Sequence, residues 1–164
     1  EPMGPNAWVV FDVADEATYT GAFTAWNGIV STSRNKGGFI KTGAGTLNLS
    51  LADRNNYTII EVREGAVKVP QTAATQFLDT IVVSNGASFF VNAGGYTSMD
   101  RLCGDGLVTN AASASQILQF TDASAEPSAF GGVISSGIQL VSEGGTILLT
   151  GTNSAFGSRS RIAA

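Results

Sequence analysis

The sequence predicts an all-β fold, a parallel β-solenoid of roughly six to eight short coils. The composition is one reason: 20 of the 164 residues are glycine, and only 13% are charged. Glycine tolerates the positive φ of tight turns, and uncharged hydroxyl residues suit a pleated surface. No segment repeats apolar residues at helical spacing between two caps.

The second reason is a repeat. Glycine followed by a small residue and alternating apolar residues recurs with leading glycines at 45, 65, 86, 106 and 145, at gaps of 20, 21, 20 and 39. The last gap is close to two periods, and the skipped position falls in the irregular segment 124–132. A period near 20 is too short for a propeller blade, but it suits one solenoid coil whose strands stack on the next.

Each unit is expected to hold two short strands with a glycine corner between them. Residues 58–62 precede the corner at Gly65, and residues 80–83 precede the corner at Gly86. Alternate residues of a strand share a face, so one set of side chains should point inward and stack in columns. The Phe89-Phe90 pair leaves the register there ambiguous by one residue. The expected inward residues are Leu47, Leu49, Val67, Val69, Phe89, Val91, Ile147 and Leu149.

Two stretches read nearly alike: GGFIKTGAGTLNLS at 37–50 and QLVSEGGTILLT at 139–150. Both are interpreted as structural rungs, with repeat-like units at about 11–69 and 120–156. The first unit holds ten extra residues around AWNGIVSTSR (25–34), interpreted as a loop or a partial coil. Loops inserted into solenoids gather on one face and often carry binding function.

The stretch FIKTGAGTLNLS with NNYTIIEVREGAVKV, and more loosely AFGGVISSGIQLVSEGGTILLTGTNSAF, resembles the autotransporter-associated β-strand repeat. The resemblance implies a right-handed parallel β-helix in the secreted passenger of a Gram-negative autotransporter or a related surface protein. In that family the repeat is a stalk and folding element and brings no catalytic residues. We therefore expect residues 1–164 to be a single solenoid segment of a longer secreted chain, outside the cell or on the outer-membrane surface.

The composition argues against several other functions. The chain has no histidine, which excludes Ser-His-Asp and Cys-His catalysis and histidine metal sites. A net charge of −4 without a basic patch disfavours a nucleic-acid partner. The sequence contains no apolar run of about 18 residues, so insertion of this segment into a membrane is not expected. Cys103 is the only cysteine, so no internal disulfide can form, and we expect it to be a small buried hydrophobic residue.

No residue is assigned a catalytic, cofactor-binding or metal-binding role, and no cofactor is expected. Asp12, Asp15 and Glu16 lie close together and are interpreted as solvated turn carboxylates; calcium binding there stays open, because calcium needs six to eight oxygens. Lys41 is a candidate base for a lyase. Because Val141 takes its place in the second stretch, a structural role is preferred.

These observations favour a non-catalytic structural or adhesive segment whose partners are the rest of a longer polypeptide and a host or environmental glycan or protein. One alternative is a carbohydrate-binding module that uses the loop at 24–36 and aromatic residues; Trp8 is instead expected to plug the open end of the coil stack. A less favoured alternative is a polysaccharide-cleaving β-helix enzyme, which would need Asp, Lys and Arg clustered on one strand face. The aromatic residues in question are Trp8, Tyr19, Trp26 and Tyr57.

Overall fold

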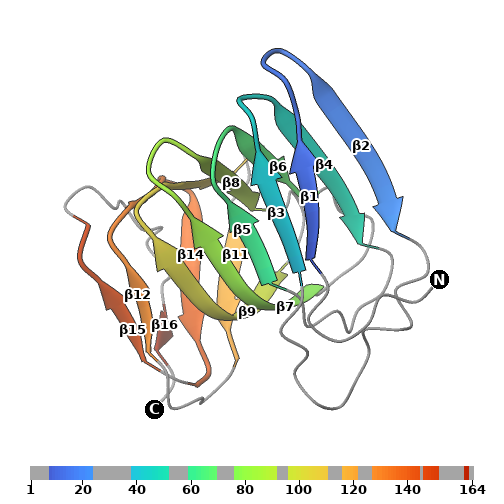
Figure 1. Ribbon diagram of the computed structural model, residues 1–164. Helices are drawn as coiled ribbons and strands as arrows, with labels where there is room; N and C mark the ends of the chain where they lie inside the picture. The colour runs from blue at the N-terminus through green and yellow to red at the C-terminus, as the bar shows by residue number, and fades with distance from the viewer. Residues whose placement is uncertain are drawn as a thin grey trace.

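The computed structural model describes residues 8–23, 38–51, 59–69, 76–91, 96–110, 116–121, 127–144, 146–151 and 161–162. Within these ranges every regular element is a strand, and sixteen strands form two sheets (Figure 1). The ten-stranded sheet contains β1 (Trp8–Asp12), β3 (Gly38–Thr42), β5 (Ile59–Val62), β7 (Gln76–Val83), β9 (Tyr96–Gly104), β11 (Gln116–Phe120), β12 (Ser128–Phe130), β14 (Ile138–Ser142), β15 (Ile147–Leu149) and β16 (Arg161–Ile162). The six-stranded sheet contains β2 (Thr18–Phe23), β4 (Thr46–Leu51), β6 (Ala66–Lys68), β8 (Ser88–Val91), β10 (Leu107–Asn110) and β13 (Val133–Ile134).

Neighbouring strands in the described ranges pair in parallel, most of them near the predicted period; the offsets between β1 and β3, β2 and β4, and β10 and β13 are longer. Thr46 of β4 lies beside Ala66 of β6, 20 residues later, and Ile59 of β5 lies beside Thr80 of β7, 21 residues later. Strands β1 and β2 lie at one end of the stack, and β14 and β15 lie toward the other (Figure 1). The prediction of an all-β parallel solenoid is therefore confirmed. Its right-handed sense stays a prediction.

The ten-stranded sheet covers two faces of the solenoid, because β7 and β9 bend where the chain turns a corner. The start of β9 pairs with β11, whereas Gly104 at its end pairs with Phe130 of β12. Met99 and Leu102 are both fully buried although they lie three positions apart, so the inward–outward alternation changes phase at the bend. The first face consists of β1, β3, β5, β12 and β15 together with the C-terminal ends of β7 and β9. The six-stranded sheet is the second face, and the starts of β7 and β9 with β11, β14 and β16 form the third.

The core is a set of columns in which inward side chains of successive coils stack. On the second face Leu47 lies beside Val67, which lies beside Phe89, and all three are fully buried. Phe89 points inward and Phe90 outward, which resolves the register of β8. Of the eight residues predicted to point inward, six are at most 2% exposed, namely Leu47, Leu49, Val67, Val69, Phe89 and Val91. The other two, Ile147 and Leu149, are partly buried and pack against the core.

Glycine corners join the first face to the second. Gly65 has φ of +64°, and a Cβ there would overlap the carbonyl oxygen of Gly45 in the preceding corner. Only glycine combines this φ with this approach of two backbones. Backbone hydrogen bonds tie one corner to the next: the Ala66 amide donates to the Gly45 carbonyl at 3.1 Å, and the Ser88 amide donates to the Gly65 carbonyl at 2.9 Å. The predicted corners at 45, 65, 86 and 106 each lead into a strand of the second face.

Gly145 itself lies outside the described residues, but the strand expected to follow it in the glycine series is placed differently. The strand after it, Ile147–Leu149, pairs with Ser128–Phe130 on the first face and does not extend the second. The corner of that series lies instead within the segment treated as irregular: Gly132 stacks on Gly106, and Val133 then pairs with Leu107.

The two similar stretches consequently lie on different faces. Residues 38–42 form β3 on the first face, whereas residues 138–142 form β14 on the third. Lys41 points inward, but Val141 alternates with the buried residues Leu140 and Ser142 and points outward. Every face needs the same alternation of apolar residues, so the likeness of the two stretches did not indicate which face each one forms.

Candidate functional site

Among the charged residues whose burial the structure describes, Lys41 is the one that is fully buried. Its strand, β3, turns Phe39 and Lys41 inward, so the aliphatic stem of the lysine runs through the core. The Nζ donates hydrogen bonds to three carbonyl oxygens: Thr42 at 2.7 Å, Gly43 at 2.6 Å and Glu64 at 3.3 Å. The ammonium therefore joins the corners of two successive coils from the inside.

Burial lowers the pKa of the Lys41 ammonium below its ordinary value, and the negative charges of Asp12 and Glu64 partly offset that effect. A lysine that acts as a general base must have a free lone pair within reach of a substrate proton. The Lys41 ammonium donates to three backbone oxygens, and the residue has no exposed surface. This geometry supports the structural role over the role of a lyase base.

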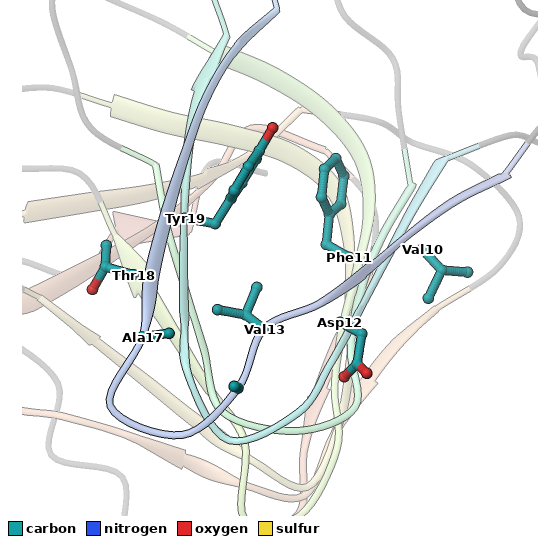
Figure 2. Close-up of a pocket in the computed structure, with 8 residues that line it drawn as sticks. Val10, Phe11, Asp12, Val13, Ala17, Thr18 and Tyr19 are labelled. Atoms are coloured by element: carbon teal, nitrogen blue, oxygen red, sulfur yellow. The ribbon is translucent and has the colours of Figure 1, made fainter.

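The end of the solenoid at β1 and β2 has a concave region of about 500 Å³. Figure 2 shows the rings of Phe11 and Tyr19 side by side between the two strands, with Val13 below them and Val10 and Thr18 pointing away. The ring centroids of Phe11 and Tyr19 are 5.9 Å apart, and Phe11 also packs on Phe39 at 5.6 Å. Tyr19 is 51% exposed although Leu47, its neighbour in the column, is fully buried. The region is apolar and aromatic, with Asp12 at its rim.

Trp8 does not plug this end, contrary to the expectation. It precedes the inward residue Val9, shares the outward side of β1 with Val10 and is 42% exposed. The ring that lies over the end of the core is Phe11, because it stands on the opposite side of the same strand. The other proposed members of an aromatic platform, Trp26 and Tyr57, and the loop at 24–36 lie outside the described residues.

A second concave region, of about 400 Å³, lies on the outside of the corner between the first and second faces. Asn85, Ser88 and Asp105 supply its polar groups, and Leu107 and Val133 supply its apolar floor. Gly86 leaves the region open, because no atom lies within 4 Å of the position a Cβ would take. Hydroxyl, amide and carboxylate groups around a small apolar surface match the hydrogen-bonding edge and apolar face of a sugar ring.

Asp12, Asp15 and Glu16 do not share a common ligand or hydrogen-bond donor among the described contacts. Asp12 accepts a hydrogen bond from the Thr42 hydroxyl at 3.1 Å, and Asp15 accepts one from the Glu16 amide at 3.0 Å. In the part of the chain that the structure describes, no three His, Cys, Asp or Glu side chains lie close enough to hold a metal ion. Glu16 has φ of +57°, which a turn residue can adopt.

Cys103 was predicted to be buried, and the structure corrects this. The thiol is free and half-buried, on the outward side of β9, while its neighbour Leu102 is fully buried. The bend of β9 changes the phase of the alternation before Cys103, and no local pattern in the sequence indicates that change. The same change of phase brings Cys103 into an outward row of apolar residues that the sequence analysis missed.

No family model, curated protein or solved structure matches the chain. Among the described residues no helix is long and apolar enough to span a membrane. The class of protein is therefore defined by the fold: a parallel β-solenoid with glycine corners, a buried lysine and, among the described residues, the two concave regions above.

Proposed function

We propose that this chain is a non-catalytic structural or adhesive segment of a secreted or cell-surface protein of the autotransporter type, displayed by a Gram-negative bacterium. The observation that carries the proposal is the continuous parallel stacking of coils from β1 to β15, with an apolar core and in-register corners. In such a stack each coil contacts only its two neighbours, so further coils can be added without altering the fold, as an extended structural segment requires. The sequence resemblance to the autotransporter repeat supports the same role.

The arrangement of the ionisable residues also supports a non-catalytic role. The buried lysine donates its hydrogens to the backbone, and Asp12, Asp15 and Glu16 lie exposed at the end of the stack. General acid–base chemistry needs a group held near a substrate and a partner. The test is incubation of the purified chain with pectin, other acidic glycans and peptides, with and without calcium. We expect no turnover; turnover that disappears in Asp15→Asn or Lys41→Met would overturn the proposal.

Location is tested with the full-length gene product in its source organism. Antibodies raised against the solenoid are applied to intact and to permeabilised cells, and external protease is added in parallel. Labelling of intact cells, lost after protease treatment, is expected for a surface segment. Labelling only after permeabilisation would contradict the cell-surface assignment and would leave the solenoid fold unaffected.

A carbohydrate-binding module is the second candidate, and the corner region lined by Asn85, Ser88 and Asp105 favours it. Glycan-array binding that is lost in Asp105→Ala but kept in Asp15→Ala would support this candidate. The matched control is useful because both carboxylates lie in exposed turns while only Asp105 lines the corner region. Binding that both variants keep would exclude the corner region as the site.

A further inference from the structure

A row of apolar side chains crosses the outside of the first face. The pairing register places Val10 beside Ile40, Val82 beside Cys103, and Ala129 beside Leu148. The pairing of Phe130 with Gly104 brings Ala129 beside Cys103 and joins these pairs. Glu61 stands between Ile40 and Val82, with its carboxylate held by Arg63 at 2.9 Å. We call this row the outward ladder; its apolar members are Val10, Ile40, Val82, Cys103, Ala129 and Leu148.

The outward ladder is accessible, and its composition is unusual for the solvent side of a sheet. Val10 is 59% exposed and Leu148 is 53% exposed, while Ile40, Val82 and Cys103 are partly exposed. Trp8, two residues before Val10 on the same side of β1, adds another exposed apolar side chain. A sheet with one face in water ordinarily carries polar residues on that face, and exposed apolar surface marks interaction sites; here the apolar row is interrupted once, by the Glu61–Arg63 pair.

The central outward row of the second face is mostly polar. That row contains Thr20, Asn48, Lys68, Phe90 and Thr109 in register. The Asn48 amide donates to the Thr20 hydroxyl at 3.4 Å, and the Lys68 ammonium lies 4.8 Å from the centre of the Phe90 ring and shields it. This row of the second face is therefore more polar than the outward ladder, although Leu107 and Val133 also point outward beside the corner.

The length and the border of the ladder indicate the shape and charge of a partner. From β1 to β15 the first face spans six strand-to-strand steps of about 4.8 Å, or about 29 Å. A helix of about 20 residues is about 30 Å long. Along the corner beside the ladder lie the exposed carboxylates of Asp12, Glu64 and Asp105; the one exposed cation there among the described residues, Arg63, is paired with Glu61. A second copy of this chain, with the same net charge of −4, would bring further negative charge to this border.

We propose that the first face binds a basic amphipathic helix. Its apolar side lies along the outward ladder, and its lysines or arginines face the acidic corner. The ladder would bind such a helix whether the solenoid is a stalk or a glycan-binding module. Failure of this proposal is therefore separable from failure of the proposed function.

The test uses the whole chain and a labelled helical peptide of about 20 residues, matched to the face length, with leucines on one side and lysines on the other. Binding is followed by fluorescence anisotropy at low and high salt. Two control peptides have the same length: one carries glutamate in place of lysine, and one has the same composition in shuffled order. The variants are Val82→Lys in the ladder and Thr109→Lys on the second face, both outward and partly exposed, and thermal melts check that each variant folds.

We expect the basic amphipathic peptide to bind, and to bind about tenfold more weakly to Val82→Lys while Thr109→Lys changes the Kd less than about twofold. Salt should weaken the binding, since the acidic corner contributes to it. Equal binding of the shuffled or the glutamate peptide would overturn the proposal. So would absence of binding, or self-association in sedimentation that Val82→Lys abolishes, because the face would then serve a second copy of the chain.

Discussion

The Lys41 ammonium lies inside the solenoid and donates a hydrogen bond of 2.6 Å to the carbonyl oxygen of Gly43, the turn residue two positions later. The same nitrogen reaches the Glu64 carbonyl in the next coil at 3.3 Å. A charged donor thus satisfies backbone acceptors that bend into the core at the corner, where the pairing of strands is interrupted. The corner depends on a side chain as well as on its glycines.

Removing this ammonium should destabilise the chain. In Lys41→Ala the buried carbonyls lose a charged donor and the core loses the packed stem, so we expect the free energy of unfolding to fall by about 3 kcal/mol. Lys68→Ala is the control, because its ammonium lies outside over Phe90, and removal of an exposed cation–π contact costs about 0.5–1 kcal/mol. Urea denaturation measures both. Equal losses would contradict a special role for Lys41.

The lowered pKa of Lys41 also predicts a pH dependence. Burial makes the folded chain bind this proton less tightly than the unfolded chain does. Well below both pKa values the lysine is charged in both states, so the full desolvation cost opposes folding. As the pH rises through the lowered pKa toward the ordinary value of about 10.4, the cost disappears and stability rises.

The measurement compares the natural chain with Lys41→Met by urea denaturation at increasing pH. We expect the difference in the free energy of unfolding to move in favour of the natural chain as the pH approaches about 10.4. Lys68→Met, which also removes one lysine, accounts for the alkaline behaviour of the rest of the chain. A difference that stays constant, or that moves toward the variant, would mean that burial does not lower the pKa of Lys41.

Leu49 is fully buried on β4, and its neighbour Asn48 points outward. Leu49→Asp places an unpaired carboxylate in the core and should cost about 4 kcal/mol or unfold the chain. Asn48→Asp introduces the same charge on the outward side of the same strand and should change stability by about 0.5 kcal/mol or less. Thermal denaturation followed by circular dichroism distinguishes them. Similar melting temperatures would mean that the inward register of β4 is wrong.

Alanine substitutions at Gly65 and Gly86 distinguish the stability cost of steric overlap from the cost of a strained backbone conformation. Both have positive φ, +64° and +81°, but a Cβ at Gly65 overlaps the Gly45 carbonyl, whereas a Cβ at Gly86 meets nothing within 4 Å. Gly86→Ala should cost only the left-handed strain of about 1–2 kcal/mol. Gly65→Ala has the same strain and must also push the corner at Gly65 away from the corner at Gly45, so its loss of stability should be clearly larger. Chemical denaturation of the pair tests this, and a larger loss in Gly86→Ala would show that contact between corners does not limit the stack.

Several features follow from local pattern and were predictable. A coil that stacks in parallel must return to the same register after a nearly constant number of residues, which is why glycines at 45, 65, 86 and 106 revealed the corners. Alternation along a strand depends only on the geometry of the extended chain. That is why Leu47, Val67 and Phe89 were placed inward correctly.

Other features depend on how distant parts of the chain meet. The bend of β9 reverses the side on which Cys103 lies. The position of Ile147 on the first face follows from its pairing with Ser128 of β12, which the local sequence does not indicate. The sequence marked Lys41 as structural, but its burial follows from the corners of two coils that converge on its ammonium. The outward ladder likewise arises only when Val10, Val82 and Leu148 are brought into one row by parallel pairing. Such contacts join residues many positions apart, and their geometry is decided by the phase of each bend, for which a local sequence window carries no signal.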